Sequence, residues 1–252
     1  MSRANVELVE SIITGFAARK PRTDLIAEDL EYVNPPYAVE AGVRRDRQAL
    51  NGVFDVYPDY RFEPERYVDV GHDVLVIGLA HGTSSSGMKG PWKQAHIWTI
   101  RDGKAIRFRW FNDPDEALRD AIAQSFRGAM EAYSRGEFDR ALGAFHPDIE
   151  WSVDAAIQPD PETYRGHEGV RRFWGTWGEV IEEMRLEVEE CRALDERQVL
   201  AITRAAGTGA GSGAEVQSSR FAELAEFEDG LVVRVRLFGS VREALTAAGA
   251  SS

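Results

Sequence analysis

Several features that commonly announce a function are scarce or missing in this chain of 252 residues. It has a single cysteine, Cys191, which excludes an intrachain disulfide. Its five histidines show no HExxH spacing, so we expect no metal site. The GxSxG, Walker and helix-opening GxGxxG motifs are also lacking. The sequence therefore predicts no nucleophile elbow, no P-loop and no cofactor.

Long apolar runs and an excess of basic charge are absent as well. No run approaches the roughly 18 apolar residues that a membrane span needs, and the start, Met1 to Glu7, lacks the apolar core of a secretory signal. The net charge of −12 argues against a nucleic-acid partner, because such partners present a basic face. We expect a cytoplasmic protein that contacts neither membrane nor nucleic acid.

What the chain does have is an internal repeat. Asp29-Leu30-Glu31-Tyr32 reappears as Asp148-Ile149-Glu150-Trp151. Later segments repeat in the same order, ending with the pair Asp102-Gly103 and Asp229-Gly230. A period of about 120 residues is far longer than a solenoid or propeller repeat and equals a small domain. The sequence therefore predicts a duplicated domain, with copies at residues 1–120 and 121–252.

Each copy has helical periodicity first and strand periodicity afterwards. Apolar residues at helical spacing predict helices near residues 6–16, 50–57, 126–133 and 138–145. The second half of each copy alternates as strands do, and it should form four or five antiparallel strands joined by hairpins. Glycine-rich stretches at 82–90 and 207–213 are expected to be exposed loops. The pattern is typical of an α+β fold in which helices fill the concave side of a curved sheet.

The segment between the copies is expected to be helical. Residues 115–133 contain no proline and only one glycine, Gly128. We predict that the last helix of copy one continues into the first helix of copy two, which would make the linker stiff.

Three segments of copy two carry a resemblance to a known family: Tyr133 to Phe138, Phe145 to Trp151, and Tyr164 to Val170. Copy one shows it through Asp29 to Tyr32, Trp98 to Lys104, and Glu116 to Leu118. The chain resembles the SnoaL-like branch of the NTF2-like superfamily over nearly its whole length. The resemblance implies two tandem cone-shaped α+β barrels, each with an apolar pocket at its wide end. It also implies that the copies pair through their sheets as an intrachain pseudo-dimer, for which the burial of Arg107, Arg109, Arg234 and Arg236 is a test.

The resemblance leaves the activity open, because the superfamily includes polyketide cyclases, isomerases, dehydratases, epoxide hydrolases and proteins without catalysis. Many SnoaL-like chains end their last strand with an acid, an aromatic residue and an aspartate. Copy one has Trp110-Phe111-Asn112-Asp113 there and keeps one acid, whereas copy two has Leu237-Phe238-Gly239-Ser240 and keeps none. The pocket of copy two is therefore expected to be degenerate.

Candidate catalytic groups lie in copy one. Acid/base chemistry needs a base and hydrogen-bond donors for the oxygen that gains charge. We predict His96 or Asp113 as the base, with donors and an apolar wall supplied by Tyr32, Asn34, Tyr37, Asn112, Phe54, Trp98 and Trp110. Strand alternation places His96 and Trp98 on one face. The alternatives are that His96 is a hydrogen-bonded core residue, that Asp113 caps the following helix, and that Tyr32 serves packing.

Copy two has Glu223 at the position of His96 in copy one. Around it we expect Arg204, Arg220, Asp154 and Trp151. Such a cluster of arginines and carboxylates could be a buried ion pair or could hold an anionic ligand. Cys191 lies between acidic neighbours that should raise its thiol pKa, which makes a nucleophilic role poorly supported.

Three functions follow as hypotheses. The first is cofactor-independent acid/base catalysis on a small hydrophobic metabolite in copy one. The second is non-catalytic binding of a small apolar ligand. The third is a structural module whose pockets are filled by tryptophan and other large side chains. A titratable group that faces the pocket opposite a donor would distinguish the first from the second.

Overall fold

The computed structural model divides the chain into two compact units, Met1–Ala121 (unit 1) and Ile122–Ser252 (unit 2). It describes residues 3–38, 40–83, 87, 89–158, 161–209 and 215–249. Of the two glycine-rich stretches expected to be exposed loops, residues 84–86, 88 and 210–213 lie outside the described residues. Among the described residues, no helix is long and apolar enough to cross a membrane.

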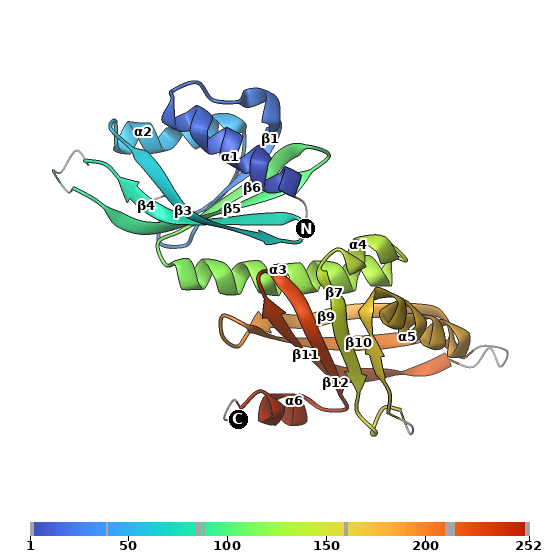
Figure 1. The fold of residues 1–252 in the computed structure, drawn as a ribbon. Helices are drawn as coiled ribbons and strands as arrows, with labels where there is room; N and C mark the ends of the chain where they lie inside the picture. Colours follow the sequence, from blue (N-terminus) through green and yellow to red (C-terminus); the bar gives the residue numbers. More distant parts are fainter. Residues whose placement is uncertain are drawn as a thin grey trace. The chain divides into compact units, whose positions relative to one another are not determined.

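Unit 1 is an α+β fold in which helices and a six-stranded sheet follow the predicted order (Figure 1). Its elements are α1 (Arg3–Ala17), η1 (Thr23–Leu25), β1 (Ile26–Asn34), β2 (Gly42–Arg45), η2 (Arg47–Gly52), α2 (Val53–Val56), β3 (Arg61–Val70), β4 (Asp73–His81), β5 (Trp92–Arg101) and β6 (Lys104–Phe111). The helix expected near residues 50–57 is therefore split into a 3₁₀ turn and one short helix.

Unit 2 repeats the plan. It contains α4 (Phe138–Leu142), β7 (Phe145–Val153), β8 (Thr163–Arg165), α5 (Gly166–Val180), β9 (Ile181–Ala193), β10 (Gln198–Gly209), β11 (Glu215–Glu228), β12 (Leu231–Phe238) and α6 (Val241–Ala247). Here the helix expected to extend to Phe145 ends at Leu142, and Phe145 begins a strand. The two units thus confirm a duplicated α+β domain.

The two sheets share one topology, with strand orders β2-β1-β6-β5-β4-β3 and β8-β7-β12-β11-β10-β9. In each sheet the last four strands form an antiparallel meander, as predicted. One pair in each sheet is parallel instead: β1 runs parallel to β6, and β7 runs parallel to β12. In unit 1 the meander begins with β3 at one edge of the sheet and ends with β6, which lies beside β1 and runs in the same direction. In unit 2, β12 lies beside β7 in the same way.

The turns of the meander are set by local sequence. Asp102 and Gly103 both have positive φ, at 50° and 71°, and Asp229 and Gly230 repeat this at 47° and 83°. Two successive residues of positive φ make the tight hairpin turn that matches the strand twist, and Asp-Gly is a favoured pair for it. The same two residues therefore fix the β5–β6 and β11–β12 hairpins.

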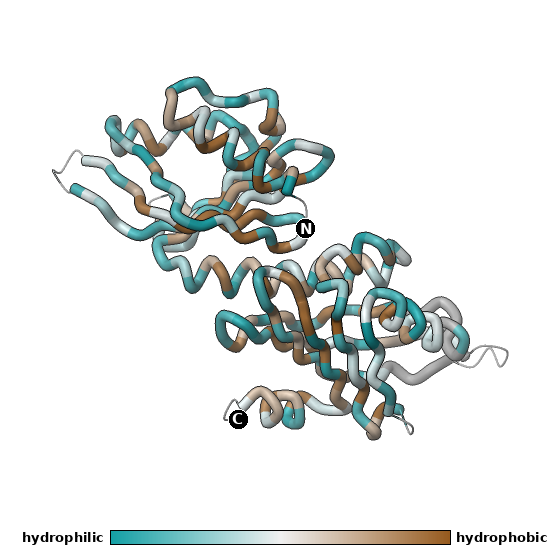
Figure 2. The backbone as a smooth tube through the Cα atoms, in the orientation of Figure 1, coloured by the Kyte–Doolittle hydropathy of each residue, from teal (hydrophilic) through white to brown (hydrophobic). Residues whose placement is uncertain are grey.

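The core of unit 1 lies between α1 and the inner face of the sheet. The buried Val9 and Ile12 of α1 pack with Val74, Val76 and other inner-face residues. Burying each such side chain contributes about 2 kcal/mol. Figure 2 shows apolar positions along α1 and the strands of both sheets, and this periodic pattern is what predicted the helix and the sheet.

Helix α3 (Pro114–Ser134) is continuous across the boundary between the units, which confirms the predicted helix over 115–133. Its first part is held to unit 1 by a partly buried ion pair between Arg109 of β6 and Asp120. Arg109 also binds Asp73 at 2.7 Å. All three residues belong to unit 1. The burial of Arg109 therefore follows from contacts within unit 1 and is not evidence that the two copies pair.

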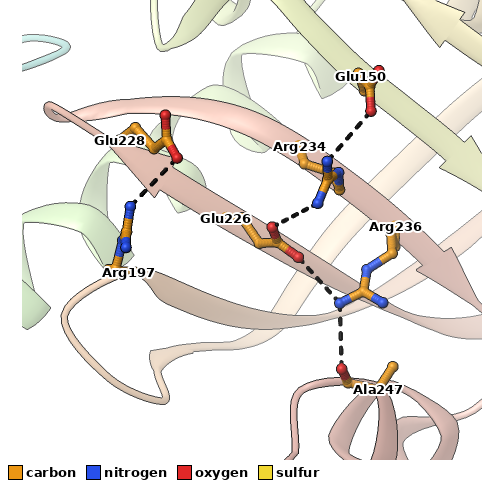
Figure 3. Close-up of polar contacts among 7 residues, drawn as sticks. All are labelled: Glu150, Arg197, Glu226, Glu228, Arg234, Arg236 and Ala247. Atoms are coloured by element: carbon orange, nitrogen blue, oxygen red, sulfur yellow. Dashed lines mark hydrogen bonds and ion pairs between the residues drawn. The ribbon is translucent and has the colours of Figure 1, made fainter.

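The counterpart of Arg109 in unit 2 repeats this connection (Figure 3). Arg236 of β12 donates to the carbonyl oxygen of Ala247 in α6 at 3.4 Å and binds Glu226 at 3.1 Å. Arg234 also binds Glu226, at 3.1 Å, and is half exposed. In both units an arginine of the last strand therefore reaches the helix that follows it.

Candidate functional site

A cavity of about 750 Å³ opens in unit 1 and is called the unit 1 cavity below. It is bordered by α1, the β1–β2 segment, η2, α2 and the strands β3, β5 and β6. Eight of the residues predicted for the site in copy one line it: Tyr32, Asn34, Tyr37, Phe54, His96, Trp98, Trp110 and Asn112. The structure thus brings all predicted copy-one residues except Asp113 to one cavity.

Strand register explains why these side chains meet. His96 pairs with Trp110, and Trp98 pairs with Phe108, across β5 and β6. Tyr32 of β1 pairs with Phe108 on the other side. Because alternate residues of neighbouring strands point to the same face, this register places His96 and Trp98 together on the concave face, as predicted.

The cavity changes character from its floor to its rim. The floor residues His96, Trp98, Phe62 and Phe108 are 3–8% exposed. The charged residues in the lining are all exposed and belong to the rim: Glu40, Arg44, Asp55 and Arg61. An apolar floor below a charged rim is typical of pockets that bind small hydrophobic molecules.

His96 is held at the floor by rings and by one hydrogen bond. Its ring stacks on Phe62, with centroids 4.0 Å apart, and meets the edge of Phe108 at 5.2 Å. Its Nε2 lies 3.1 Å from Oε1 of Gln94, which also accepts a hydrogen bond from the Tyr60 hydroxyl at 2.6 Å. Burial lowers the pKa of His96 to about 3. The imidazole is therefore neutral at pH 7 and a weak base.

Sequence reasoning missed Gln94 and Tyr60, which complete this chain of hydrogen bonds. Gln94 lies two residues before His96 on the same strand, so the alternation that placed His96 with Trp98 also placed Gln94 on that face. Tyr60 carried no comparable signal because it precedes β3 in an irregular segment.

Asp113 does not line the cavity. Its Oδ1 accepts a hydrogen bond from the backbone N–H of Asp115 at 2.9 Å, and its carboxylate lies 3.8 Å from Arg119. This is the capping arrangement at the start of α3 that the sequence offered as the alternative. The geometry supports capping for Asp113 and gives no support to its catalytic role.

The rim is tied together by the remaining polar residues. Trp110 Nε1 donates to Asn34 Oδ1 at 3.0 Å, and Asn34 Nδ2 donates to the carbonyl oxygen of Glu40 at 2.8 Å. The Tyr37 hydroxyl accepts from the N–H of Asn112 at 3.0 Å. Burial raises the pKa of the neighbouring Tyr32 to about 12, so its hydroxyl stays protonated. The predicted donors therefore serve mainly to fix the segment between β1 and β2.

In unit 2 the structure separates the residues that the sequence grouped. Glu223 of β11 is 3% exposed, whereas Arg220 is exposed and binds Glu189 at 2.8 Å. The two lie three positions apart on one strand, an odd number, so their side chains face opposite sides of the sheet. Trp151 is 1% exposed and packs against Phe173, with centroids 5.4 Å apart. Arg220 and Glu223 therefore form no ion pair with each other, which was one of the two alternatives for this cluster.

Glu223 lies in unit 2 where His96 lies in unit 1. It pairs with Ala201 and Leu237 on the neighbouring strands, and its Oε2 accepts a hydrogen bond from the Thr203 hydroxyl at 2.9 Å. Burial raises its pKa from 4.5 to about 7. A carboxyl group that titrates near neutrality can donate or accept a proton under ordinary conditions.

Two aromatic residues on the inner sheet face of unit 1 have aliphatic counterparts in unit 2. Ala225 and Leu237 replace Trp98 and Trp110 on the inner face, according to the repeat. The rings of Tyr133 in α3 and Trp174 in α5 stack instead, with centroids 4.5 Å apart. The two copies therefore build different interiors on one topology.

The remaining reactive groups offer little further chemistry. Burial, more than the acidic neighbours that the sequence suggested, raises the pKa of Cys191 to about 12. Its thiol donates to the carbonyl oxygen of Ala123 at 3.2 Å. Across the described ranges, no group of three or more His, Cys, Asp and Glu residues is placed to hold a metal ion.

Comparison with known families gives the class of this protein. A family model described as the SnoaL-like domain matches residues 12–108 and again residues 126–235. The chain belongs to the SnoaL-like domain family and carries two tandem copies of that domain. No curated protein matches the chain.

Solved structures that are similar to parts of this chain have low sequence identity to it. An NTF2-like protein of unknown function from Burkholderia pseudomallei K96243 is 23% identical, with a TM-score of 0.41 over 49% of this chain and 93% of that chain. A protein assigned provisionally as a SnoaL-like polyketide cyclase, from Jannaschia sp. CCS1, is 19% identical, with a TM-score of 0.40 over 55% of this chain and 95% of that chain. Each therefore corresponds to about half of this chain.

Proposed function

We propose that unit 1 binds a small, largely apolar molecule in its cavity. The observation that carries this proposal is the cavity itself, about 750 Å³ in volume, with buried rings at its floor and its charged side chains confined to an exposed rim. Such a site holds ligands through apolar contact and a few placed polar groups. His96, neutral and hydrogen-bonded through Nε2, is one of those polar groups.

Binding can be tested with the uncharged fluorescent probe N-phenyl-1-naphthylamine. The probe should brighten on addition of the protein and saturate. Val53→Trp, which places a large ring in the cavity lining, should weaken probe binding at least about tenfold by occupying the site. Val43→Trp adds the same ring at an exposed position outside the lining and is the matched control. Equal binding by both variants would count against the cavity as the site.

The second candidate function is cofactor-independent acid/base catalysis on a small hydrophobic metabolite, of cyclase, isomerase, dehydratase or epoxide hydrolase type. In unit 1 it would depend on His96 or Asp113, and the low pKa of His96 and the capping contact of Asp113 favour binding instead. The observation in favour of catalysis lies in unit 2, where the buried Glu223 has a pKa of about 7.

Catalysis can be tested by proton abstraction from carbon. Deuterium exchange at the α-carbon of 2-indanone should be accelerated by the protein if a base is available to a ketone. Loss of that acceleration in Glu223→Gln would assign it to unit 2, and loss in the double variant His96→Ala, Asp113→Ala would assign it to unit 1. Exchange at the rate of buffer alone would leave binding as the function of this chain.

Pairing of the two copies as an intrachain pseudo-dimer, and any further self-association, are separate proposals that rest on the tandem duplication. Spin labels on Arg107→Cys and Arg234→Cys, one in each unit, would report the pairing as a narrow distance distribution. A broad distribution would refute it. Light scattering coupled to size-exclusion chromatography measures self-association.

A further inference from the structure

Two polar atoms at the floor of the unit 1 cavity have no hydrogen-bond partner among the residues that the structure describes. They are Nδ1 of His96 and Nε1 of Trp98, and both atoms are buried. The residues themselves are 7% and 3% exposed and both belong to the cavity lining. Buried polar groups nearly always have partners, because leaving one unpaired costs free energy. Two such atoms on neighbouring lining residues point to a ligand group that completes them.

The hydrogen-bonding role of each atom is fixed by its surroundings. Gln94 Oε1 is a carbonyl oxygen and can only accept, so Nε2 of His96 carries the proton and donates to it. The Tyr60 hydroxyl donates to the same oxygen at 2.6 Å and holds it in place. Since the ring is neutral, Nδ1 carries a lone pair and is an acceptor. The indole Nε1–H of Trp98 can only donate.

We propose that the unit 1 cavity recognises an uncharged aromatic ligand through a hydroxyl group, which donates to Nδ1 of His96 and accepts from Nε1–H of Trp98. This inference rests on the proposed binding function and names the ligand class. A hydroxyl is the smallest group that donates and accepts at once, and residues two apart on a strand present neighbouring side chains on one face.

Other ligand groups fit the floor less well. A ketone or ether oxygen can accept from Trp98 but leaves Nδ1 of His96 unpaired. A carboxylate would set its charge beside that lone pair, and an ammonium group would find no carboxylate among the floor residues, since the acidic lining residues lie at the exposed rim. The surrounding rings of Phe62 and Phe108 favour an aromatic skeleton, which packs edge to face against them.

The ligand class can be tested by calorimetric titration of the full chain with three matched probes. 4-Hydroxybiphenyl, 4-methoxybiphenyl and biphenyl share one skeleton, and only the first can both donate and accept. We expect 4-hydroxybiphenyl to bind about tenfold or more tightly than the other two, because each of them leaves Nδ1 of His96 unpaired. His96→Leu and Trp98→Phe should each reduce this preference to about threefold or less.

Trp174→Phe is the matched control for Trp98→Phe. Nε1 of Trp174 is likewise buried and has no partner within the described part of the chain, but it belongs to unit 2. Its substitution should leave the preference for the hydroxyl unchanged. Should either floor variant fail to fold, the ¹⁵N resonance of His96 Nδ1 in the wild-type protein gives an independent reading, because it should move when 4-hydroxybiphenyl binds and not when biphenyl binds.

The outcomes separate this inference from the function on which it rests. Equal affinity for the three probes would overturn the hydroxyl contact and leave the cavity as an apolar site. Binding of 4-hydroxybiphenyl without movement of the His96 Nδ1 resonance would also overturn it. Failure of all three probes to bind, together with N-phenyl-1-naphthylamine, would overturn both proposals.

Discussion

Glu223 makes the stability of unit 2 depend on pH in a direction that is unusual for an acidic side chain. Burial raises its pKa from 4.5 to about 7 in the folded state, so the folded protein holds this proton more tightly than the unfolded chain does. Because the folded state binds more protons over that range, the free energy of unfolding falls as pH rises from about 4.5 to about 7. The stabilising contribution of the proton is fully present below the lower value and lost above the higher one.

The magnitude follows from the two pKa values. One pKa unit corresponds to about 1.4 kcal/mol, so the difference amounts to roughly 3 kcal/mol in total. About 1 kcal/mol of that cost has already appeared at pH 5, because the unfolded carboxyl is largely ionised there. Between pH 5 and pH 8 the wild type should therefore lose about 2 kcal/mol relative to a variant that cannot ionise at this position.

Glu223→Gln is the appropriate variant, since the amide keeps the shape of the side chain and its carbonyl oxygen can still accept from Thr203. Urea unfolding of both proteins at pH 5, 6, 7 and 8 gives the difference in the free energy of unfolding at each pH. Glu189→Gln is the control. Two arginines lower the pKa of Glu189, so its contribution is already complete above pH 5 and its effect should be flat over this range. A flat difference for Glu223→Gln as well would refute the buried, protonated carboxyl.

Three further predictions concern stability. Arg109→Met should lower the free energy of unfolding by about 3 kcal/mol, because it leaves the buried carboxylate of Asp73 and the partly buried carboxylate of Asp120 without their partner. Urea unfolding at pH 7 measures this loss, and a value below about 1 kcal/mol would contradict the prediction. Gly128→Ala should stabilise the protein by about 1 kcal/mol, because Gly128 is exposed inside α3 and nothing lies near the added methyl group. Gly103→Ala should destabilise the protein by about 1 kcal/mol, because the φ of Gly103 is 71°. Equal melting temperatures for the two variants would contradict both expectations. Asp113→Ala should cost about 1 kcal/mol through the lost helix cap and leave binding of N-phenyl-1-naphthylamine unchanged, and weakened probe binding would instead assign Asp113 to the site.

The arrangement of the unit 1 cavity was largely predictable because strand alternation is a strong constraint. Side chains two residues apart on a strand point to the same face of the sheet, and this rule alone placed His96 with Trp98. The same rule, applied to Arg220 and Glu223, would have placed them on opposite faces. In the structure Arg220 accordingly binds Glu189, while Glu223 is buried on the other face.

Other features had no signal in the sequence. The pKa values of His96 and Glu223 depend on how completely neighbouring elements bury them, and one sequence does not report burial depth. The stacking of Tyr133 of α3 on Trp174 of α5 is similar, because it depends on how the two helices pack in unit 2. The parallel pairing of β1 with β6 requires the path of the whole chain.

Helix α3 has a consequence for the order in which the chain folds. The first turn of a helix is costly to form, and each later residue adds to it at little cost. Cut at the boundary between the units, α3 would leave one segment shorter than the roughly 12–15 residues below which isolated helices are marginally stable, and a second segment within that range. Unit 1 leaves the ribosome first, and its Arg109–Asp120 contact anchors the first turns of α3. The second copy can then extend an existing helix rather than begin one, so the duplication shares a single nucleation event between its two halves.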